Sequence, residues 1–495
     1  MQKPLSILFV SSEVSPFVNE TPLSSFMNGL PISLKTKSND VRIAVPRYGI
    51  VSDRNPYVYN ISKLSNLSFT NYNGKIENFD VKSTSIQNTK TKVPIYAISC
   101  PKYFDNRKGI YTDPVKQNQY TDNLERFVFF SRAVVEMCAK LNWEPDIIHC
   151  SDWQTALIPA YVKYFHLNNF KKTKTVFTIH NFNSQGVFPI EKFNLLELPD
   201  DAKESYTHKQ EINLIKGGML YSNKITTPSP AYKELISKNK NYSNGLNTYI
   251  KLHYPDIMAI NSGIDTNTWN PRKDTLIPVI LKKDYIDFKQ QNKEHFLSTY
   301  KINLKSDIPL ISVISQFSEV NNKELLLELI PNILSSNDVI IFVQDTNCNP
   351  ELKKQLTNLS KQFSKKLILD FSKDETVSHQ LLAASDMTLH INQYNSDASL
   401  FQSAAIYGSV PITFLTGGIK DIAIPIKKSN INVANSFSIT NLKVNSILDV
   451  VNQSIKTFND KNLWHQLVKN TMSSDYCWDD SVNQYLNIYR NIIKH

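Results

Sequence analysis

Two polar side chains stand where short apolar segments end, and open α/β sheets bind their ligands at such positions. Asp152 follows the segment "DIIHCS", and His180 closes the segment "TVFTIH" and is followed by Asn181. Aspartate and histidine are residue types used for acid–base catalysis and substrate binding. A lone histidine at a strand end is nevertheless more often a hydrogen-bonded structural residue. The residues by themselves therefore leave both a structural and a catalytic role open.

Thr416, Gly417 and Gly418 form a second candidate site in "FLTGGIKD", where an apolar strand turns into a helix. Two glycines at a helix N-terminus allow backbone N–H groups to point at an anion. By itself the triplet also fits an ordinary tight turn. A comparable strand-to-helix turn at residues 7–26, "ILFVSSEVSPFVNETPLSSF", contains no glycine. This raises the question of whether a phosphate can bind there.

The elements that must position these residues are short strands alternating with helices. Short apolar segments bounded by turn residues recur along the first half of the chain, among them "SILFVSS", "VRIAVP", "VPIYAIS", "TKTVFTIH" and "NKITTPS". Such β-branched segments are typical of strands buried on both faces. The helical stretches between them, such as 125–141, indicate a parallel sheet. We therefore predict an α/β fold whose first domain is doubly wound.

The same rhythm starts again in the second half with "PLISVISQ", "DVIIFVQD", "DMTLHI" and "VPITFL". We predict two Rossmann-like doubly wound domains, at residues 1–265 and 266–475, facing a central cleft. The last segment, 476–495, has apolar residues at helical spacing, and we expect it to form a helix that packs back on the first domain. A chain of 495 residues is too long for one hydrophobic core, which supports this division.

Charge and cysteine usage argue against several classes of protein. The net charge of +10 comes from lysines scattered along the chain, so we do not expect a nucleic-acid partner. The five cysteines form no CxxC pair, and we expect free thiols in a reducing compartment, no metal site and no cofactor. No apolar run approaches the ~20 residues that span a bilayer. The first strand begins near Leu5, so we expect neither a membrane partner nor a leader peptide.

Four stretches strongly resemble the bacterial glycogen synthase and plant starch synthase family: "PDIIHCSDWQTALIPAYVK", "KTVFTIHNFNSQGVFP", "INLIKGGMLYSNKITTPSPAY" and "SGIDTNTWNP". The resemblance stays in register from "LFVSSEVSPF" to "WDDSVNQYLNIYR", which is nearly the whole chain. It implies two facing Rossmann-like domains, the GT-B arrangement. It also implies transfer of glucose from ADP-glucose to the non-reducing end of an α-1,4-glucan, with retention of configuration.

The resemblance also implies roles for the candidate residues. His180 matches the family histidine that lies beside the transferred glucose, and Asp152 matches an acidic residue of a neighbouring family motif. These two residues are the catalytic candidates. Asn181, Gln185 and Gly186 are the matching candidates for binding the sugar. The triplet at 416–418 becomes a candidate contact to the nucleotide diphosphate or the sugar.

Several family positions carry different residues in this chain. Glucosyl transfer builds negative charge on the diphosphate leaving group, which cations and backbone N–H groups must neutralise. The family's Lys-Thr-Gly-Gly-Leu run reads "NETPL" here, with Asn19 for the lysine and Pro22, which has no N–H, for a glycine. Gln316 and Asn321 replace an arginine and a lysine, and Asn395 replaces a glutamate that supports the transition state. Neutral amides can donate hydrogen bonds but supply no charge.

We therefore expect a glycogen or starch synthase homologue that is catalytically impaired or silent, a pseudoenzyme. Its expected partners are an α-1,4-glucan, ADP-glucose bound weakly or not at all, and an active synthase. Two alternatives stay open: an active glucan synthase with a rearranged site, and a basic nucleic-acid-binding protein. The expected location is the cytoplasm of a bacterium, or the plastid stroma if the gene is organellar, and we do not expect secretion.

Overall fold

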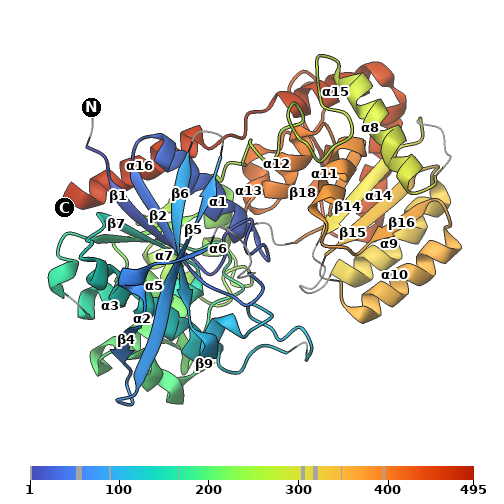
Figure 1. Ribbon diagram of the computed structural model, residues 1–495. Helices are drawn as coiled ribbons and strands as arrows, with labels where there is room; N and C mark the ends of the chain where they lie inside the picture. Colours follow the sequence, from blue (N-terminus) through green and yellow to red (C-terminus); the bar gives the residue numbers. More distant parts are fainter. Residues whose placement is uncertain are drawn as a thin grey trace. The chain divides into compact units, whose positions relative to one another are not determined.

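The computed structural model describes residues 3–51, 58–88, 91–116, 118–165, 167–302, 307–315, 322–346, 348–393 and 396–494. The chain forms two compact units. Unit 1 comprises Met1–Asp265 and Trp478–His495, and unit 2 comprises Thr266–Cys477. Each unit is built around its own mainly parallel sheet flanked by helices (Figure 1).

The main sheet of unit 1 has the strand order β13-β12-β8-β7-β1-β2-β6-β5-β3, with β4 paired to β5. Its strands are β1 (Ser6–Val10), β2 (Asp40–Pro46), β3 (Tyr59–Asn60), β4 (Leu67–Thr70), β5 (Ile76–Gln87), β6 (Lys92–Ser99), β7 (Ile147–Ser151), β8 (Lys174–Thr178), β12 (Lys224–Thr227) and β13 (Ile257–Ala259). The pairs that involve β3, β4 and β5 are antiparallel, and the others are parallel. A small antiparallel sheet contains β9 (Val187–Pro189), β10 (Thr207–His208) and β11 (Glu211–Asn213).

The helices of unit 1 cover both faces of its sheet. They are α1 (Pro22–Thr36), α2 (Asn123–Leu141), α3 (Ile158–Tyr164), α4 (Lys203–Tyr206), α5 (Leu214–Tyr221), α6 (Pro230–Lys238), α7 (Asn247–Leu252) and α16 (Asp479–Lys494). Some starts follow from local sequence: Asn213 accepts a hydrogen bond from the N–H of Lys216 at the start of α5. Ser229 accepts one from the N–H of Tyr232 at the start of α6, where Pro230 takes the first helical position.

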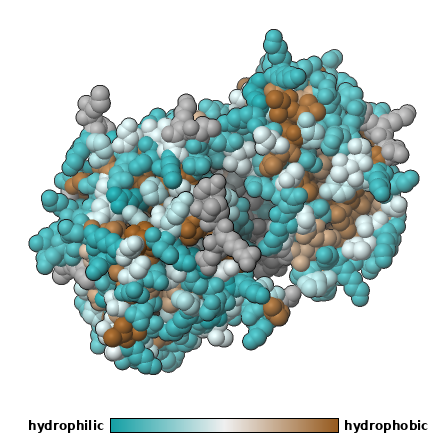
Figure 2. All heavy atoms as spheres, viewed as in Figure 1, coloured by the Kyte–Doolittle hydropathy of each residue, from teal (hydrophilic) through white to brown (hydrophobic). Residues whose placement is uncertain are grey.

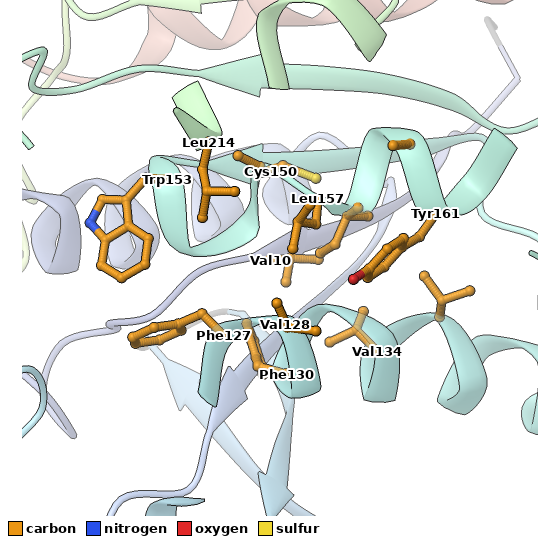
Figure 3. Close-up of a cluster of buried hydrophobic side chains, with 14 of the residues drawn as sticks. Val10, Phe127, Val128, Phe130, Val134, Cys150, Trp153, Leu157, Tyr161 and Leu214 are labelled. Carbon is orange, nitrogen blue, oxygen red and sulfur yellow. The ribbon is translucent and has the colours of Figure 1, made fainter. Parts of the chain in front are cut away.

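Successive side chains of β1 enter two different cores, as the two-residue period of a strand requires. Leu8 and Val10 belong to a buried cluster with apolar residues of α2, α3 and α5. In Figure 3, Val10 lies between the side chains of β7 and α3 on one side and those of α2 on the other. Ile7 and Phe9 belong to a second cluster, which α1 and α16 close. A strand apolar on both faces is therefore buried on both faces, as the sequence predicts.

Helix α16, the last element of the chain, belongs to unit 1. Its Tyr485 and Tyr489 are buried in the cluster with Phe9 and Phe26. Tyr489 Oη lies 2.6 Å from Nδ1 of His149 on β7. The apolar side chains of α16 therefore pack in the core of unit 1, against the first sheet.

The sheet of unit 2 is parallel throughout and has the strand order β16-β15-β14-β17-β18-β19. The strands are β14 (Leu310–Ser315), β15 (Ile340–Asp345), β16 (Leu367–Asp370), β17 (Met387–His390), β18 (Val410–Phe414) and β19 (Phe437–Ile439). Numbered within the unit, this is the order 3-2-1-4-5-6 of a Rossmann fold. The helices are α8 (Tyr285–Thr299), α9 (Asn322–Ser336), α10 (Pro350–Gln362), α11 (Glu375–Ala384), α12 (Ser399–Ile406), α13 (Gly417–Ile422), α14 (Val444–Asn459) and α15 (Lys461–Ser473).

The surface is mixed in character. On the face shown in Figure 2, hydrophilic residues cover most of each unit, and hydrophobic residues show in patches between them. Within the described ranges, no helix is long and apolar enough to cross a membrane.

Candidate active site

The carboxyl ends of β1 and β7 meet at the point where the strand order of unit 1 reverses. These strands are neighbours, although β2 follows β1 in the chain and β8 follows β7. Open α/β sheets bind ligands at this kind of switch point, because the loops leaving the two strands turn to opposite sides. Here β1 leads into residues 11–21, and β7 leads into Asp152.

Asp152 has a backbone conformation that side chains rarely adopt, with φ +59° and ψ −178°. This region is nearly exclusive to glycine and costs about 1–3 kcal/mol, and such residues concentrate at functional sites. Hydrogen bonds hold the residue in place. Its N–H donates to the carbonyl of Thr178 at 3.0 Å, and its Oδ1 accepts from the N–H of His180 at 2.7 Å. The end of β7 is thereby fixed to the end of β8.

His180 is 6% exposed and lies beside Asp152. Its Nδ1 is 3.3 Å from Oδ2 of Asp152, but the two groups are not aligned as a hydrogen bond, and neither ring nitrogen has a hydrogen-bond partner in the described part of the chain. The ring of Phe26 packs edge-on at 4.5 Å between centroids. Buried polar atoms are nearly always satisfied, so these nitrogens fit a ligand-binding histidine better than a structural one.

Both amide atoms of the Gln185 side chain are hydrogen-bonded within the protein. Its Nε2 donates to the carbonyls of Phe182, at 2.9 Å, and Ser243, at 2.8 Å. Its Oε1 accepts from Nδ2 of Asn213 at 2.6 Å. In this arrangement Gln185 shapes the loop after β8 and has no free donor for a sugar.

Asn181 and Gly186 belong to the same loop. Asn181 is half-buried, and its Oδ1 accepts from the N–H of Asn183 at 2.8 Å. Gly186 has a φ of +62°, and a Cβ there would lie 2.8 Å from the ring of Trp153. This close approach places the loop against the residue that follows Asp152.

Glu13 fills the turn between β1 and α1, and sequence reasoning missed it. The side chain is fully buried, and its Oε2 accepts from the N–H groups of Glu20 at 3.1 Å and Thr21 at 2.9 Å. Its Oε1 accepts from Tyr111 Oη at 2.9 Å. Burial raises the pKa of Glu13 to about 7, although these hydrogen bonds act in the opposite direction. The signal was a charged residue inside the otherwise apolar and small "FVSSEVSPF".

The remaining residues of this turn provide few hydrogen-bond donors for an anion. Pro22 takes the first position of α1, so the helix starts without one N–H. Asn19 Oδ1 accepts from Oγ of Ser24 at 2.6 Å. The N–H groups before the helix are those that bind Glu13. The N-terminus of α1, which favours an anion, is therefore occupied by a carboxylate of the chain itself.

In unit 2 the triplet Thr416, Gly417 and Gly418 follows β18 and begins α13. Thr416 is buried, and a Cβ on Gly418 would lie 2.7 Å from the backbone of Asp397. Asp397 stands just before α12, and its Oδ1 accepts from the N–H of Ser399 at 3.2 Å. The start of α13 therefore packs closely on the backbone of Asp397.

Three residues of the sequence-based site, Gln316, Asn321 and Asn395, lie outside the described residues. Their roles stay predictions. Across the described ranges there is no group of three or more His, Cys, Asp or Glu that could hold a metal ion.

Comparison with known proteins adds an independent result. Residues 6–251 match the family model "Starch synthase catalytic domain". The glycogen synthase of Chlorobaculum parvum is 30% identical over 98% of both chains, and that of Clostridium botulinum (strain Alaska E43) is 30% identical over 99% of both. The catalytic domain of starch synthase IV from Arabidopsis thaliana, solved with ADP and acarbose, has the same fold. It matches with a TM-score of 0.89 and 23% identity over all of both chains.

Together with two doubly wound units, these likenesses define a GT-B glycosyltransferase. Within that class the chain belongs to the glycogen and starch synthase family. The fold class and the family that the sequence predicts are thus confirmed.

Proposed function

We propose that this protein is a glycogen or starch synthase homologue whose glucosyl transfer is strongly impaired and which binds an α-1,4-glucan. The family reaction would take glucose from ADP-glucose. One observation carries the impairment: Pro22 takes the first position of α1, where the family run has a glycine, so the helix begins without one N–H. A diphosphate arriving at this turn would lack that donor.

The expected size of the loss follows from the leaving group. Losing one fixed donor to a developing negative charge lowers the rate by about 10² to 10³. Pro22 supplies no N–H, and Asn19 carries no charge. By the resemblance to the family, three further charged residues are replaced by neutral ones, at Gln316, Asn321 and Asn395. Such effects are not additive, and a combined loss above roughly a thousandfold is a fair expectation.

The pair of Asp152 and His180 supports sugar binding. Both side chains are largely shielded from water, and the ring nitrogens of His180 have no hydrogen-bond partner among the described residues, although Nδ1 lies 3.3 Å from Oδ2 of Asp152. A sugar hydroxyl can both donate to and accept from such groups. Because this pair is intact, an active glucan synthase with a rearranged site is the second candidate. Association with an active synthase, and a location in a bacterial cytoplasm or plastid stroma, remain part of the proposal.

The deciding experiment measures transfer and binding separately. The purified chain is given labelled ADP-glucose and a glycogen primer, beside an active bacterial glycogen synthase and a blank without enzyme. We expect incorporation at or near the blank, together with retention on immobilised amylopectin. Incorporation comparable to the active enzyme would establish the second candidate, and free passage through the amylopectin column would refute glucan binding. Calorimetric titration with ADP-glucose shows whether the donor still binds.

A restoration variant tests the missing charges. We expect Gln316→Arg, Asn321→Lys and Asn395→Glu together to raise incorporation at least about a hundredfold, because each supplies charge that the transition state needs. The matched control replaces the same residues by Met, Met and Gln, which add no charge. If both triple variants stay at the blank, the turn at residues 19–22 limits transfer, and adding Asn19→Lys is the next step.

A further inference from the structure

Unit 2 has a cavity of about 230 Å³ at the edge of its sheet opposite to the triplet at 416–418. Its lining includes Asp386 and Gly408, which precede β17 and β18, and Asp307, which precedes β14. These are the amino ends of the strands, whereas Thr416 follows the carboxyl end of β18. Helices α8 and α15, labelled near one end of unit 2 in Figure 1, supply most of the other lining residues.

Three lysines line this cavity: Lys289 and Lys293 from α8, and Lys461 from α15. Lys293 is buried, and its Nζ lies 2.6 Å from Oδ2 of Asp386. That aspartate therefore neutralises Lys293. The other carboxylate in the lining, Asp307, is exposed.

Lys289 and Lys461 form no ion pair with any residue that the structure describes. The half-buried Lys289 donates from Nζ to the backbone carbonyls of Leu382, at 3.0 Å, and Tyr407, at 3.1 Å. An ammonium group has three N–H donors, so one remains for a ligand. Lys461 is exposed, and its Nζ lies 3.9 Å above the ring of Phe458.

Burial, opposed by Asp386 and assisted by the neighbouring Lys293, lowers the pKa of Lys289 to about 7. Burial also lowers the pKa of Lys461. The titratable groups that line the cavity with Lys289 are thus Tyr285 and Lys293 on its own helix, Asp386, Asp307, and Lys461 and His465 on α15. A bound anion would favour the charged forms of both lysines.

The lining also includes three aromatic side chains, Tyr285, Phe458 and Trp464. Such rings offer an apolar wall for a short carbon skeleton. The volume is below the ~300–1,000 Å³ of pockets for drug-sized ligands, which restricts the ligand to a small molecule. We propose that this cavity binds a small phosphorylated metabolite, with its phosphate between Lys289 and Lys461 and its carbon skeleton against the aromatic side chains.

The test is calorimetric titration of the full chain with glycerol 3-phosphate, inorganic phosphate and glycerol, each in the presence and in the absence of excess ADP. We expect glycerol 3-phosphate to bind and glycerol not to bind. Because Lys289 gains a proton on binding near pH 7, the measured heat should depend on the ionisation enthalpy of the buffer. Lys461→Ala should weaken binding at least about tenfold, because it removes a charge-assisted hydrogen bond.

Lys353→Ala is the matched control, since Lys353 is also exposed and its Nζ lies 4.9 Å above an aromatic ring, that of Phe371. Lys353 is not part of the cavity lining. It should leave binding unchanged. Absence of binding of both phosphate compounds, or equal weakening by the two variants, would overturn the proposal. Binding seen only without ADP would assign the ligand to the donor site and overturn it as well. Equal affinities for inorganic phosphate and glycerol 3-phosphate would overturn the proposed contact between a carbon skeleton and the aromatic side chains.

Discussion

At the scale of single residues, Glu13 sets the character of the turn before α1. Its carboxylate is fully buried and accepts hydrogen bonds from two backbone N–H groups and from Tyr111. Tyr111 Oη also accepts from Nε2 of Gln154 at 2.9 Å, which ties the turn to the residues after β7. The side chain of Tyr111 thereby connects the two loops of the switch point.

The first prediction concerns the pH dependence of stability. Because the pKa of Glu13 is about 7 in the folded protein against 4.5 ordinarily, the native state holds the proton more tightly than the unfolded chain. Below about pH 4.5 the group is protonated in both states and has no effect. As the pH rises from about 4.5 to 7, the unfolded chain releases this proton while the native state keeps it, which lowers the free energy of unfolding by up to roughly 3 kcal/mol.

Glu13→Gln should remove this pH-dependent loss, because glutamine stays neutral and can still accept from the two N–H groups. Urea unfolding of wild type and variant between pH 5 and pH 8 measures it. The exposed Glu211→Gln serves as the control and should follow the wild type. Parallel curves for wild type and Glu13→Gln at all pH values would contradict the prediction.

At the scale of elements, α16 completes the face of the first sheet that α1 leaves open. Its contact with β7 is polar as well as apolar, since Tyr489 Oη lies 2.6 Å from Nδ1 of His149. His149 is fully buried, and burial lowers its pKa to about 3. The imidazole is therefore neutral at pH 7, and each ring nitrogen has a hydroxyl partner, Tyr489 on one side and Thr178 on the other.

Tyr489→Phe should destabilise unit 1 by about 1–3 kcal/mol, because it leaves Nδ1 of His149 buried without a partner. Chemical unfolding followed by circular dichroism measures the change. Tyr59→Phe is the control, since Tyr59 is 60% exposed and should have little effect. A variant as stable as the wild type would mean that water replaces the hydroxyl.

At the scale of the whole molecule, the end of the chain returns to the unit where the chain begins. Unit 1 contains Trp478–His495, whereas Thr266–Cys477 forms unit 2 with its own sheet and core. Trp478, Val482 and Tyr489 are buried in the core of unit 1. The two units therefore depend on the last helix to very different degrees.

Deleting residues 478–495 should lower the stability of unit 1 by more than about 3 kcal/mol, because each large buried side chain contributes ~1.5–3 kcal/mol. Hydrogen–deuterium exchange measures this by region. Exchange should rise in β1, β7 and α1 and stay unchanged in the strands of unit 2. An equal rise in both units would show that unit 2 depends on this helix too.

Much of the fold follows from the sequence, because local patterns encode it. The apolar segments that became β1, β7 and β18 are continuous enough to predict strands buried on both faces. Residues 125–141 have a helical pattern, and α2 spans Asn123–Leu141. The motifs around Asp152 and His180 were sufficient to identify the family, which the comparisons confirm. The replacements at Gln316, Asn321 and Asn395 were read from the sequence alone and stay predictions.

The tertiary structure decided what depends on residues far apart in the chain. Glu13 meets Tyr111 across 98 positions, and Gln185 is fully hydrogen-bonded only because Asn213 and Ser243 reach it. Lys289 and Lys461 come together at a cavity although they lie on different helices. The sequence by itself determined the strands, the helices and the family, because their periodicity and motifs are local. Packing between distant segments decides which carboxylate is buried, which amide is hydrogen-bonded and which lysines share a cavity. No local sequence pattern encodes these contacts.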